Sequence, residues 1–404
     1  MNLDFFEKQL LIDNFSEKLQ KKIFDTNCLV IGGGGIAHPL ITYLVSTGFG
    51  NISIADGDKV ELSNLHRQYH FNASDLNKRK AEVLKEKFKN EYEFIDIKSI
   101  NKFLEEKDLF ELIEQHDLIF DASDNFQTRY ISNDVCHEHK KPLISGAAEG
   151  MLGIVAAFNF KEDSPCYECL FPRNYNLNEN TCQNSGITPS VLGIIGSFMA
   201  SIALKIIADE AFKSSVMRID LSNLHRHYHF NASDLNRRKA EVLKEKFKNE
   251  YEFIDIKSIN KFLEEKDLFE LIEHHDLIFD ASDNFQTRYI SNDVCHEHKK
   301  PLISGAAEGM LGIVAAFNFK EDSPCYECLF PRNYDLNENT CQNSGITPSV
   351  LGIIGSFMAS IALKIIADNS FRSSLMRINL SDLSVSQPKL KKDVLCKICG
   401  ENKG

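Results

Sequence analysis

The residues in this sequence best suited to bind a polyphosphate are four consecutive glycines and two nearby carboxylates. Gly32–Gly35 follow an apolar run, and Asp56 and Asp58 come after the next apolar run. Glycines let the backbone approach phosphate oxygens, and a helix that starts there presents free N–H groups and a partial positive charge. An acidic residue about 20 residues after the glycines suits a ribose hydroxyl. The spacing therefore predicts a nucleotide site, although a glycine turn alone also fits a tight strand-to-helix connection.

Two basic side chains and a further carboxylate extend this set. Arg67 and Lys80 can neutralise a triphosphate, and the planar guanidinium of Arg67 suits phosphate oxygens. Asp124, in the segment Asp121–Asn125, offers oxygen ligands for Mg²⁺. Each residue also has a plainer interpretation, with the two cations as solvated surface charges and Asp124 as a helix cap. Their combination with the glycines favours the nucleotide site.

The elements that must position these residues alternate between strand and helix. Apolar runs predict strands over residues 28–31, 51–55, 92–99, 117–120 and 142–147, and helical spacing covers residues 5–22 (with a break near 13–14), 36–45, 103–116 and 126–139. This alternation predicts an α/β fold with a Rossmann-like, doubly wound parallel sheet, and ligands of such sheets bind beyond the carboxyl ends of the strands. An antiparallel extension over residues 152–160, an irregular crossover over 166–188 and a long apolar helix over 189–209 are expected to follow.

A tandem duplication organises the rest of the chain. Residues 62–209 recur as residues 221–368, shifted by 159 positions, and differ only at the pairs Gln68/His227, Lys78/Arg237, Gln115/His274 and Asn176/Asp335. The predicted domains are therefore residues 1–220, a truncated copy over 221–379 without the glycine turn and the first two strands, and a tail over 380–404. Three arrangements remain open: an intact first unit with a degenerate appendage, an internal pseudo-dimer, or a swap in which residues 1–61 complete the second copy.

Composition narrows the functional class. The 404 residues carry a formal net charge of −12, which does not favour nonspecific nucleic-acid binding. The first residues lack the basic and apolar regions of a signal peptide. Polar residues interrupt the longest apolar stretch, residues 194–208, so no membrane span of roughly 18 residues is expected and a cytoplasmic protein is predicted. Six of the eleven cysteines form C-x-x-C pairs, which favours metal binding over disulfides.

Together these motifs resemble the ThiF/MoeB/HesA family, the bacterial relatives of ubiquitin-activating enzymes. The resemblance covers residues 1–220 and the tail, and lies closest to ThiF. It rests on the glycine turn, the D-x-D segment, the S-N-L-x-R-Q segment, a following lysine and the D-N pair, here Gly32–Gly35, Asp56–Asp58, Ser63–Gln68, Lys80 and Asp124–Asn125. No single motif is specific, but the combination is.

The resemblance implies adenylation of the C-terminal Gly-Gly carboxylate of a small ubiquitin-fold sulfur carrier by Mg-ATP, with release of pyrophosphate. It implies that Asp56 binds the ribose, that Asp124 binds Mg²⁺, and that the phosphates contact Gly33, Gly34, Gly35, Asn64, Arg67 and Lys80. Cys182 matches a crossover cysteine that joins the carrier during sulfur transfer, although an inert cysteine is equally expected. Lys8 stands where relatives place an arginine that reaches the nucleotide of a partner subunit, so a homodimer or an internal pseudo-dimer is expected.

The cysteine pairs predict a structural zinc site of four thiolates. The duplication leaves three half-sites for a site that needs two. They are Cys166/Cys169, Cys325/Cys328 and the terminal Cys396/Cys399. The terminal pair can complete only one internal pair, and chain order favours Cys325/Cys328. The first pair would then be orphaned, unless another chain or an alternative packing completes it.

Four other functions stay open, the most distant of the family-like ones being activation of a peptide, as in microcin-type relatives. Activation of the molybdopterin synthase small subunit, as by MoeB, is close to the ThiF-like role in thiamine thiazole synthesis. A catalytically inactive scaffold is the alternative from another class, favoured by the broken metal pairing. An NAD-dependent oxidoreductase would leave Arg67, Lys80 and the cysteine pairs unexplained.

Overall fold

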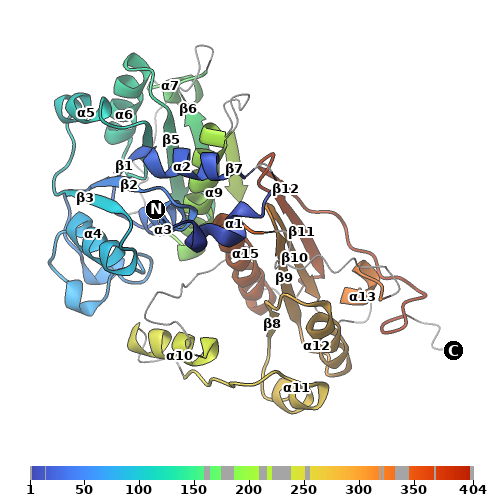
Figure 1. Ribbon diagram of the computed structural model, residues 1–404. Coiled ribbons are helices and arrows are strands. Elements are labelled where there is room, and N and C mark those ends of the chain that lie inside the picture. Colours follow the sequence, from blue (N-terminus) through green and yellow to red (C-terminus); the bar gives the residue numbers. More distant parts are fainter. Residues whose placement is uncertain are drawn as a thin grey trace.

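Seven strands of the first unit form one sheet in the computed structural model (Figure 1). They are β1 (Asn27–Ile31), β2 (Asn51–Ala55), β3 (Asp96–Ile100), β4 (Leu118–Asp121), β5 (Leu143–Glu149), β6 (Leu152–Phe158) and β7 (Val216–Asp220). The spatial order is β3-β2-β1-β4-β5-β6-β7; the first five strands are parallel, β6 is antiparallel to β5, and β7 is antiparallel to β6. The predicted Rossmann-like sheet with an antiparallel extension is confirmed. The structure describes residues 2–13, 15–158, 164–173, 186–208, 216–220, 238–250, 255–317, 320, 323–332, 345–367 and 370–400.

Helices cover both faces of this sheet because its central strands are apolar on both sides. In β1, Cys28 and Val30 join the core beneath α3 (Ala37–Thr47), α4 (Lys80–Glu91) and α9 (Pro189–Ala208). Leu29 and Ile31 point to the other face and join the core beneath α5 (Glu106–Ile113) and α6 (Phe126–Glu138). Such alternation is what a strand buried on both faces requires.

Short helices complete the first unit. The N-terminal segment folds as η1 (Leu3–Phe6), α1 (Glu7–Leu10) and α2 (Glu17–Asp25), so the predicted break near residues 13–14 is confirmed. The turns η2 (Leu62–Asn64) and η3 (Ala73–Asp75) precede α4, and α7 (Tyr167–Leu170) follows β6. Two predicted starts were wrong, since β3 starts at residue 96 and α5 at residue 106, and helix α4 was not predicted.

The second unit is a truncated version of the first. Its sheet has the order β12-β11-β10-β9-β8 and consists of β8 (Ile278–Asp280), β9 (Leu302–Glu308), β10 (Leu311–Phe317), β11 (Ser374–Asn379) and β12 (Ser384–Ser386). Its helices are α10 (Lys239–Glu250), α11 (Glu265–Ile272), α12 (Phe285–Glu297), α13 (Tyr326–Leu329) and α15 (Pro348–Ala367). β8 repeats β4 but has no β1 beside it, so Phe279 is 47% exposed whereas Phe120 is buried. The expected truncation of the second copy is confirmed.

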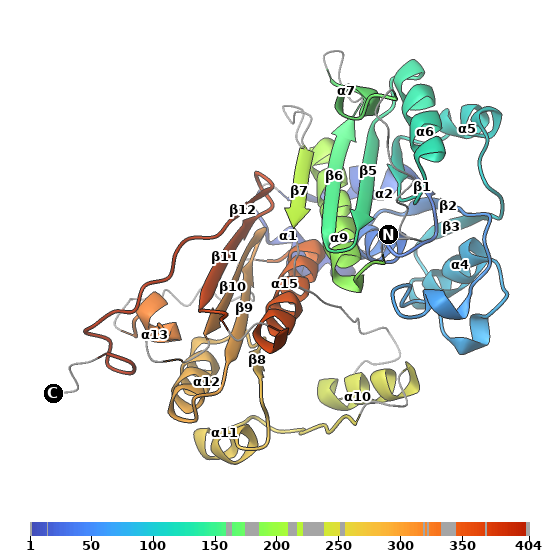
Figure 2. The ribbon, with the colours of Figure 1, turned by 180° about the vertical axis from the view of Figure 1, so that it is seen from behind.

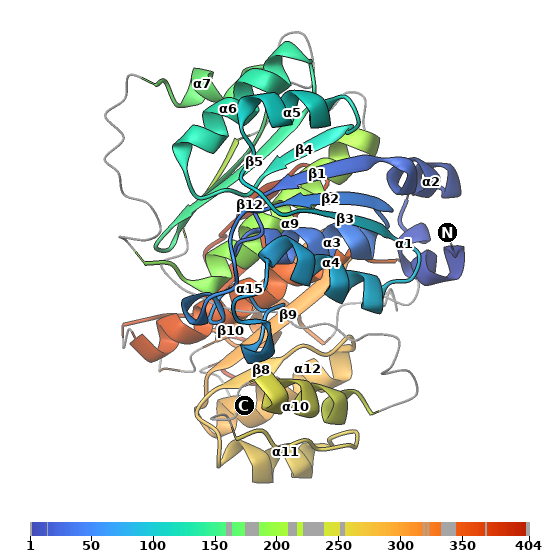
Figure 3. The same ribbon diagram turned by 90° about the vertical axis from the view of Figure 1, so that its left-hand side faces the viewer.

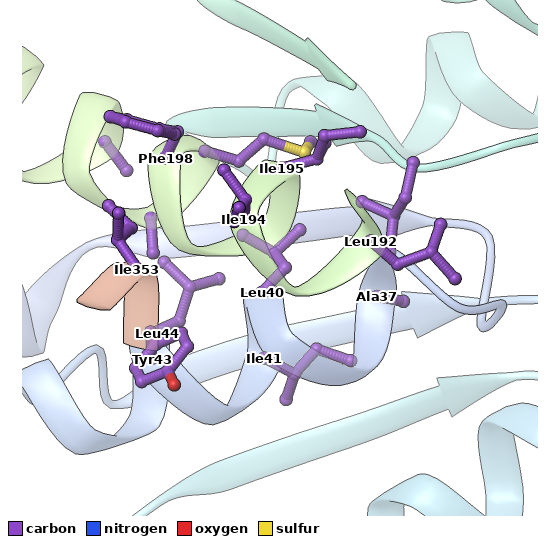
Figure 4. Close-up of a cluster of buried hydrophobic side chains, with 14 of the residues drawn as sticks. Ala37, Leu40, Ile41, Tyr43, Leu44, Leu192, Ile194, Ile195, Phe198 and Ile353 are labelled. Carbon is purple, nitrogen blue, oxygen red and sulfur yellow. The ribbon is translucent and has the colours of Figure 1, made fainter. Parts of the chain in front are cut away.

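The two units meet through helices α9 and α15, which lie side by side between the two sheets (Figure 2; Figure 3). One apolar core runs from Leu44 and Phe198 of the first unit to Ile353 of the second (Figure 4). The approach is close, since a Cβ added at Gly352 would lie 2.3 Å from the Tyr43 hydroxyl. The swap arrangement is not adopted, because β1 pairs with β4.

Helices α9 and α15 correct one sequence-based expectation. Each is 20 residues long and apolar enough to cross a membrane, so the argument that no stretch reaches that length was wrong. Their burial gives the better physical reason against a membrane span. The serines within α9 bond back to its own carbonyls, as Ser197 does to Gly193 at 2.7 Å, so they do not interrupt its apolar surface. Both helices pack against the core between the sheets.

Candidate active site at the carboxyl edge of the first sheet

A cavity of about 400 Å³ opens where β1, β2 and β4 end. Parallel strands bring their carboxyl ends to one edge, so the loops that follow them line a common space. Most of the predicted nucleotide residues lie on its wall, namely Gly34, Gly35, Asp56, Asp58, Arg67, Lys80 and Asp124. The cavity continues past Ala147–Glu149 of β5 and Leu152–Ile154 of β6, so it has a polar end and a more apolar end. The first unit thus assembles residues that are far apart in the sequence.

Gly33 and Asp56 hold the glycine turn in place. The Gly33 N–H donates to Asp56 Oδ2 at 2.6 Å, and the Asp58 N–H donates to Asp56 Oδ1 at 2.7 Å. Burial raises the pKa of the Asp56 carboxyl, while Lys80 and the two backbone donors act in the opposite direction. Gly33 itself does not line the cavity. Its backbone orients Asp56, and both carboxylate oxygens of Asp56 are engaged in the turn.

Packing explains two of the other glycines. Gly32 has φ of 97°, and a Cβ there would lie 2.8 Å from the Ala122 carbonyl oxygen. A Cβ at Gly35 would lie 2.4 Å from Leu192 of α9. Gly34 has more room, since its nearest neighbour is the Gln68 amide at 4.0 Å. Of the four glycines, Gly34 leaves the most space beside its backbone for a ligand.

Two basic side chains line the cavity beside the turn. Lys80 is buried at the start of α4, and its Nζ lies 3.0 Å from Asp58 Oδ2. The Arg67 guanidinium donates to the Ser63 carbonyl at 2.8 Å. This bond uses one nitrogen of the guanidinium and leaves other N–H groups to face the cavity. Lys80 and Arg67 together supply positive charge next to the glycine turn.

Asn64 holds the Arg67 segment and does not line the cavity. Its side-chain oxygen accepts from the Glu61 N–H at 3.0 Å, and its carbonyl accepts from the Arg67 N–H at 3.0 Å and the Gln68 N–H at 2.9 Å. Asn64 is buried. The structure therefore places it as a support for Arg67, whereas the sequence suggested phosphate contact.

Asp124 lies on a loop that the buried ion pair of Asp121 and Arg129 holds in place. Asp124 is exposed and lines the cavity, and the N-cap of α6 is Asn125, whose side chain accepts from the Thr128 N–H, so Asp124 is not the helix cap. Asp121 accepts from Arg129 at 3.0 Å, from the Ser123 hydroxyl at 2.6 Å and from Ser145 at 3.0 Å. Arg129 also donates to the Ser123 carbonyl. This network fixes both sides of the Asp124 loop.

Two further cavity residues were missed in the sequence. Gln68 is buried, and its side-chain oxygen has no hydrogen-bond partner among the described residues. Phe103 is 70% exposed, and its ring contacts Gly57 so closely that an added Cβ would lie 2.5 Å away. The motif around Arg67 contained Gln68, so its role was accessible from sequence. Nothing in the local pattern pointed to Phe103.

One predicted catalytic residue, Lys8, is not part of this assembly, and a second, Cys182, is not described by the structure. Lys8 is exposed, its Nζ lies 3.5 Å from Glu7, and its carbonyl accepts from the Ile346 N–H of the second unit at 3.1 Å. It does not line the cavity of the first unit. Cys182 lies outside the described residues, so its role stays a prediction.

Four cysteines form a cluster in the second unit. The Sγ–Sγ distance is 3.6 Å between Cys325 and Cys396 and 3.2 Å between Cys328 and Cys399. It is 4.0 Å between Cys325 and Cys328. Four thiolates around zinc with Zn–S bonds of 2.3 Å have sulfur separations of about 3.8 Å. The donor type, number and spacing fit a structural zinc ion, and the expected pairing of Cys325/Cys328 with the terminal pair matches this geometry. Cys166 and Cys169 stand apart, with Sγ atoms 3.6 Å from each other.

Comparison with known proteins agrees with this geometry. The ThiF family model matches the chain twice, over residues 6–217 and 217–398. The molybdopterin-synthase adenylyltransferase of Escherichia coli is 34% identical over 50% of this chain and 81% of its own length. The sulfur carrier protein adenylyltransferase of Thermus thermophilus is 32% identical over 51% of this chain and 78% of its own length. The Caenorhabditis briggsae adenylyltransferase and sulfurtransferase MOCS3 is 34% identical over 50% of this chain, which spans about half (51%) of that relative. The chain belongs to the ThiF family.

Proposed function

We propose that this chain adenylates the C-terminal Gly-Gly carboxylate of a small ubiquitin-fold sulfur carrier, with ATP as the second substrate. The observation that carries the proposal is the shared cavity, where Asp56, Arg67, Lys80 and Asp124 surround the glycine turn. The relatives named for adenylation of a sulfur carrier or of molybdopterin synthase support the substrate class. A cytoplasmic location remains our expectation.

The reaction forms one bond and breaks another at the α-phosphorus. A carboxylate oxygen of the carrier attacks that phosphorus, the bond to the bridging oxygen of the β-phosphate breaks, and pyrophosphate leaves with the electron pair. A carboxylate is already a nucleophile at neutral pH, so positioning and charge neutralisation matter more than a general base.

The cavity residues would divide the binding of ATP among them. Arg67 and Lys80 offset the charge of the phosphates, and Gly34 lets the backbone come close to them. The ribose lies near Asp56, where Gln68 offers an unpaired oxygen to a hydroxyl. Mg²⁺ fits the exposed Asp124 carboxylate, because oxygen donors are its preferred ligands, and it would further neutralise the phosphates.

The cavity extends beyond the polar end, which suits a second substrate. Ala147, Ala148 and Gly153 line the far end, where small side chains leave room for an extended chain end. A tail that ends in two glycines has no side chains to accommodate there. Two kinds of carrier fit the proposal. Sequence segments favour a carrier of thiamine synthesis, whereas one relative is named for molybdopterin synthase.

ATP–pyrophosphate exchange with a panel of Gly-Gly-tailed carriers of both kinds tests the proposal. The duplication supplies a matched control, because Asp283 of the second unit occupies the same sequence context as Asp124. We expect exchange that depends on one carrier, is lost with Asp124→Ala and persists with Asp283→Ala. Absence of exchange with every carrier in folded, zinc-loaded protein would contradict the proposal and favour a scaffold.

A further inference from the structure

The C-x-x-C pair of the first unit, Cys166 and Cys169, is held in a metal-binding geometry, but no described residue supplies the second half of a site. Its Sγ atoms lie 3.6 Å apart, which matches one edge of a four-thiolate zinc site, about 3.8 Å. Cys169 is exposed and Cys166 is half-buried. In the second unit the same tetrapeptide is already part of the four-cysteine cluster.

The two copies of this tetrapeptide are supported by the same contacts. The Tyr167 N–H donates to Asn133 Oδ1 at 2.6 Å, and the Tyr326 N–H donates to Asn292 Oδ1 at 2.7 Å. The backbone turn also repeats, with Cys169 N–H to the Cys166 carbonyl at 3.2 Å in the first unit. These bonds are independent of the terminal cysteines. The backbone of the Cys166/Cys169 pair is therefore held by the same hydrogen bonds as that of the Cys325/Cys328 pair, which belongs to the four-cysteine cluster.

No other described residue of the first unit completes a metal site at this pair. Among described residues, the four-cysteine cluster is the only group of three or more candidate ligands with mutually close donor atoms. The two nearest carboxylates are engaged elsewhere: Arg173 lies 3.2 Å from Glu168 and 2.5 Å from Asp134. The terminal pair is committed to the second unit. Among the described residues no further ligand lies at this pair, and two more thiolates would complete a four-thiolate site.

A second copy of the chain is the partner that fits this requirement. Helix α7, which carries the pair, lies at the outer end of the first unit and away from the second unit in both views (Figure 1; Figure 2). A two-fold axis through a metal would bring together two identical pairs and give four thiolates, the number that structural zinc takes. The flanking Glu168 and Arg173 are partly exposed and already pair with each other at 3.2 Å, so two copies of this face would not set an unpaired charge against its own like.

We propose that Cys166 and Cys169 of two copies share one zinc ion and join the chains into a dimer. The four thiols release their protons to solvent as the four Zn–S bonds form, and no electron is transferred. The site is distinct from the closed cluster at Cys325, and the proposal does not depend on the adenylation activity. It predicts three zinc ions for every two chains: one closed in each chain and one shared.

Metal analysis and light scattering on the full reduced chain, loaded with zinc, test the proposal. We expect three zinc ions per two chains and the mass of a dimer. A Cys166→Ser/Cys169→Ser double variant is expected to hold one zinc per chain and to be monomeric. The matched variant Cys325→Ser/Cys328→Ser is expected to lose the closed site but keep the shared ion and the dimer.

Spectroscopy separates the shared site from an isolated pair. Cobalt(II) bound to four thiolates absorbs differently from cobalt(II) bound to two thiolates and water. In Cys325→Ser/Cys328→Ser protein, the four-thiolate spectrum should appear with dimerisation as protein concentration rises. A monomer at every concentration, a dimer insensitive to Cys166→Ser/Cys169→Ser, or an internal disulfide in zinc-loaded reduced protein would each overturn the proposal.

Discussion

Arg129 donates to the Asp121 carboxylate at 3.0 Å, and both side chains are buried beneath the loop that carries Asp124. The same loop accepts a second bond from Arg129 at the Ser123 carbonyl. Arg129 thus acts on the candidate site through the loop backbone, as a positioning residue.

Arg129→Met is expected to lower exchange activity and stability together. It leaves the Asp121 carboxylate buried without its cation, and breaking a buried pair costs about 3 kcal/mol in unfolding free energy. The expected kinetic signature is a raised Mg²⁺ requirement, since Asp124 loses its fixed position. Arg288→Met removes the corresponding pair of the second unit, where the separation is 3.6 Å, and should leave the Mg²⁺ dependence of exchange unchanged. Equal Mg²⁺ dependence in both variants would contradict the positioning role.

Phe103 is expected to contribute to nucleotide affinity through its exposed ring. Aromatic–base stacking is worth about 1–3 kcal/mol, so Phe103→Ala should raise the KM for ATP by about tenfold or more. Inhibition by pyrophosphate should not change, because that ligand has no base. The counterpart Phe262 is fully exposed with no Gly57 equivalent beside it, and Phe262→Ala is expected to be neutral. A KM that moves equally in both variants would show that the ring has no such role.

His38 is expected to make stability depend on pH. Burial lowers the pKa of His38 well below its ordinary value of 6.5, and His70, Lys87 and Lys80 lower it further. A depressed pKa in the folded state contributes stability that is fully present above pH 6.5 and is lost as pH falls towards the folded value. Urea unfolding between pH 8 and pH 5 should therefore show a smaller loss of stability for His38→Gln than for the natural chain. Parallel losses in the two proteins would assign the pH dependence to other groups.

Removal of zinc is expected to release the C-terminal tail from the second unit. Cys396 and Cys399 are buried against Cys325, and Leu390 packs on the same apolar cluster. The tail lysines, such as Lys389 and Lys391, are already exposed, so Cys399→Ser or a strong chelator should make the tail backbone mobile enough for trypsin to cleave after them, measured by mass spectrometry. Cys166→Ser, which alters the corresponding pair of the first unit, is the control and should leave the tail protected. A tail that stays protected after zinc removal would mean that apolar packing alone holds it.

The parallel sheet and the cavity could be predicted because their determinants are local. The run Cys28–Ile31 followed by four glycines indicates strand, turn and helix without further context. The carboxyl-edge rule then places Asp56 and Asp124 together. Helix α4 was missed because its polar residues outnumber its apolar ones, although Ala81, Val83, Leu84 and Phe88 form its buried face.

The parts that escaped prediction depend on residues far away in the chain. Gly35 was assigned to phosphate binding, but the side chain that excludes a Cβ there belongs to Leu192 of α9. Phe103 follows a strand as an ordinary exposed residue, and only its contact with Gly57 marks it. The same holds for Tyr43, whose close approach to Gly352 joins the two units.

The identical sequences of β4 and of its counterpart in the second unit bear on how the chain folds during synthesis. Residues 118–121 and 277–280 have the same sequence, so strand β1 meets two equivalent pairing surfaces in one polypeptide. During synthesis the first surface leaves the ribosome 159 residues earlier, a lead of about 10 s at typical elongation rates. Strand β1 therefore has time to pair with residues 118–121 before residues 277–280 have been synthesised. Refolding of the full-length chain from denaturant lacks that head start, so the route of synthesis itself becomes part of what selects the native topology.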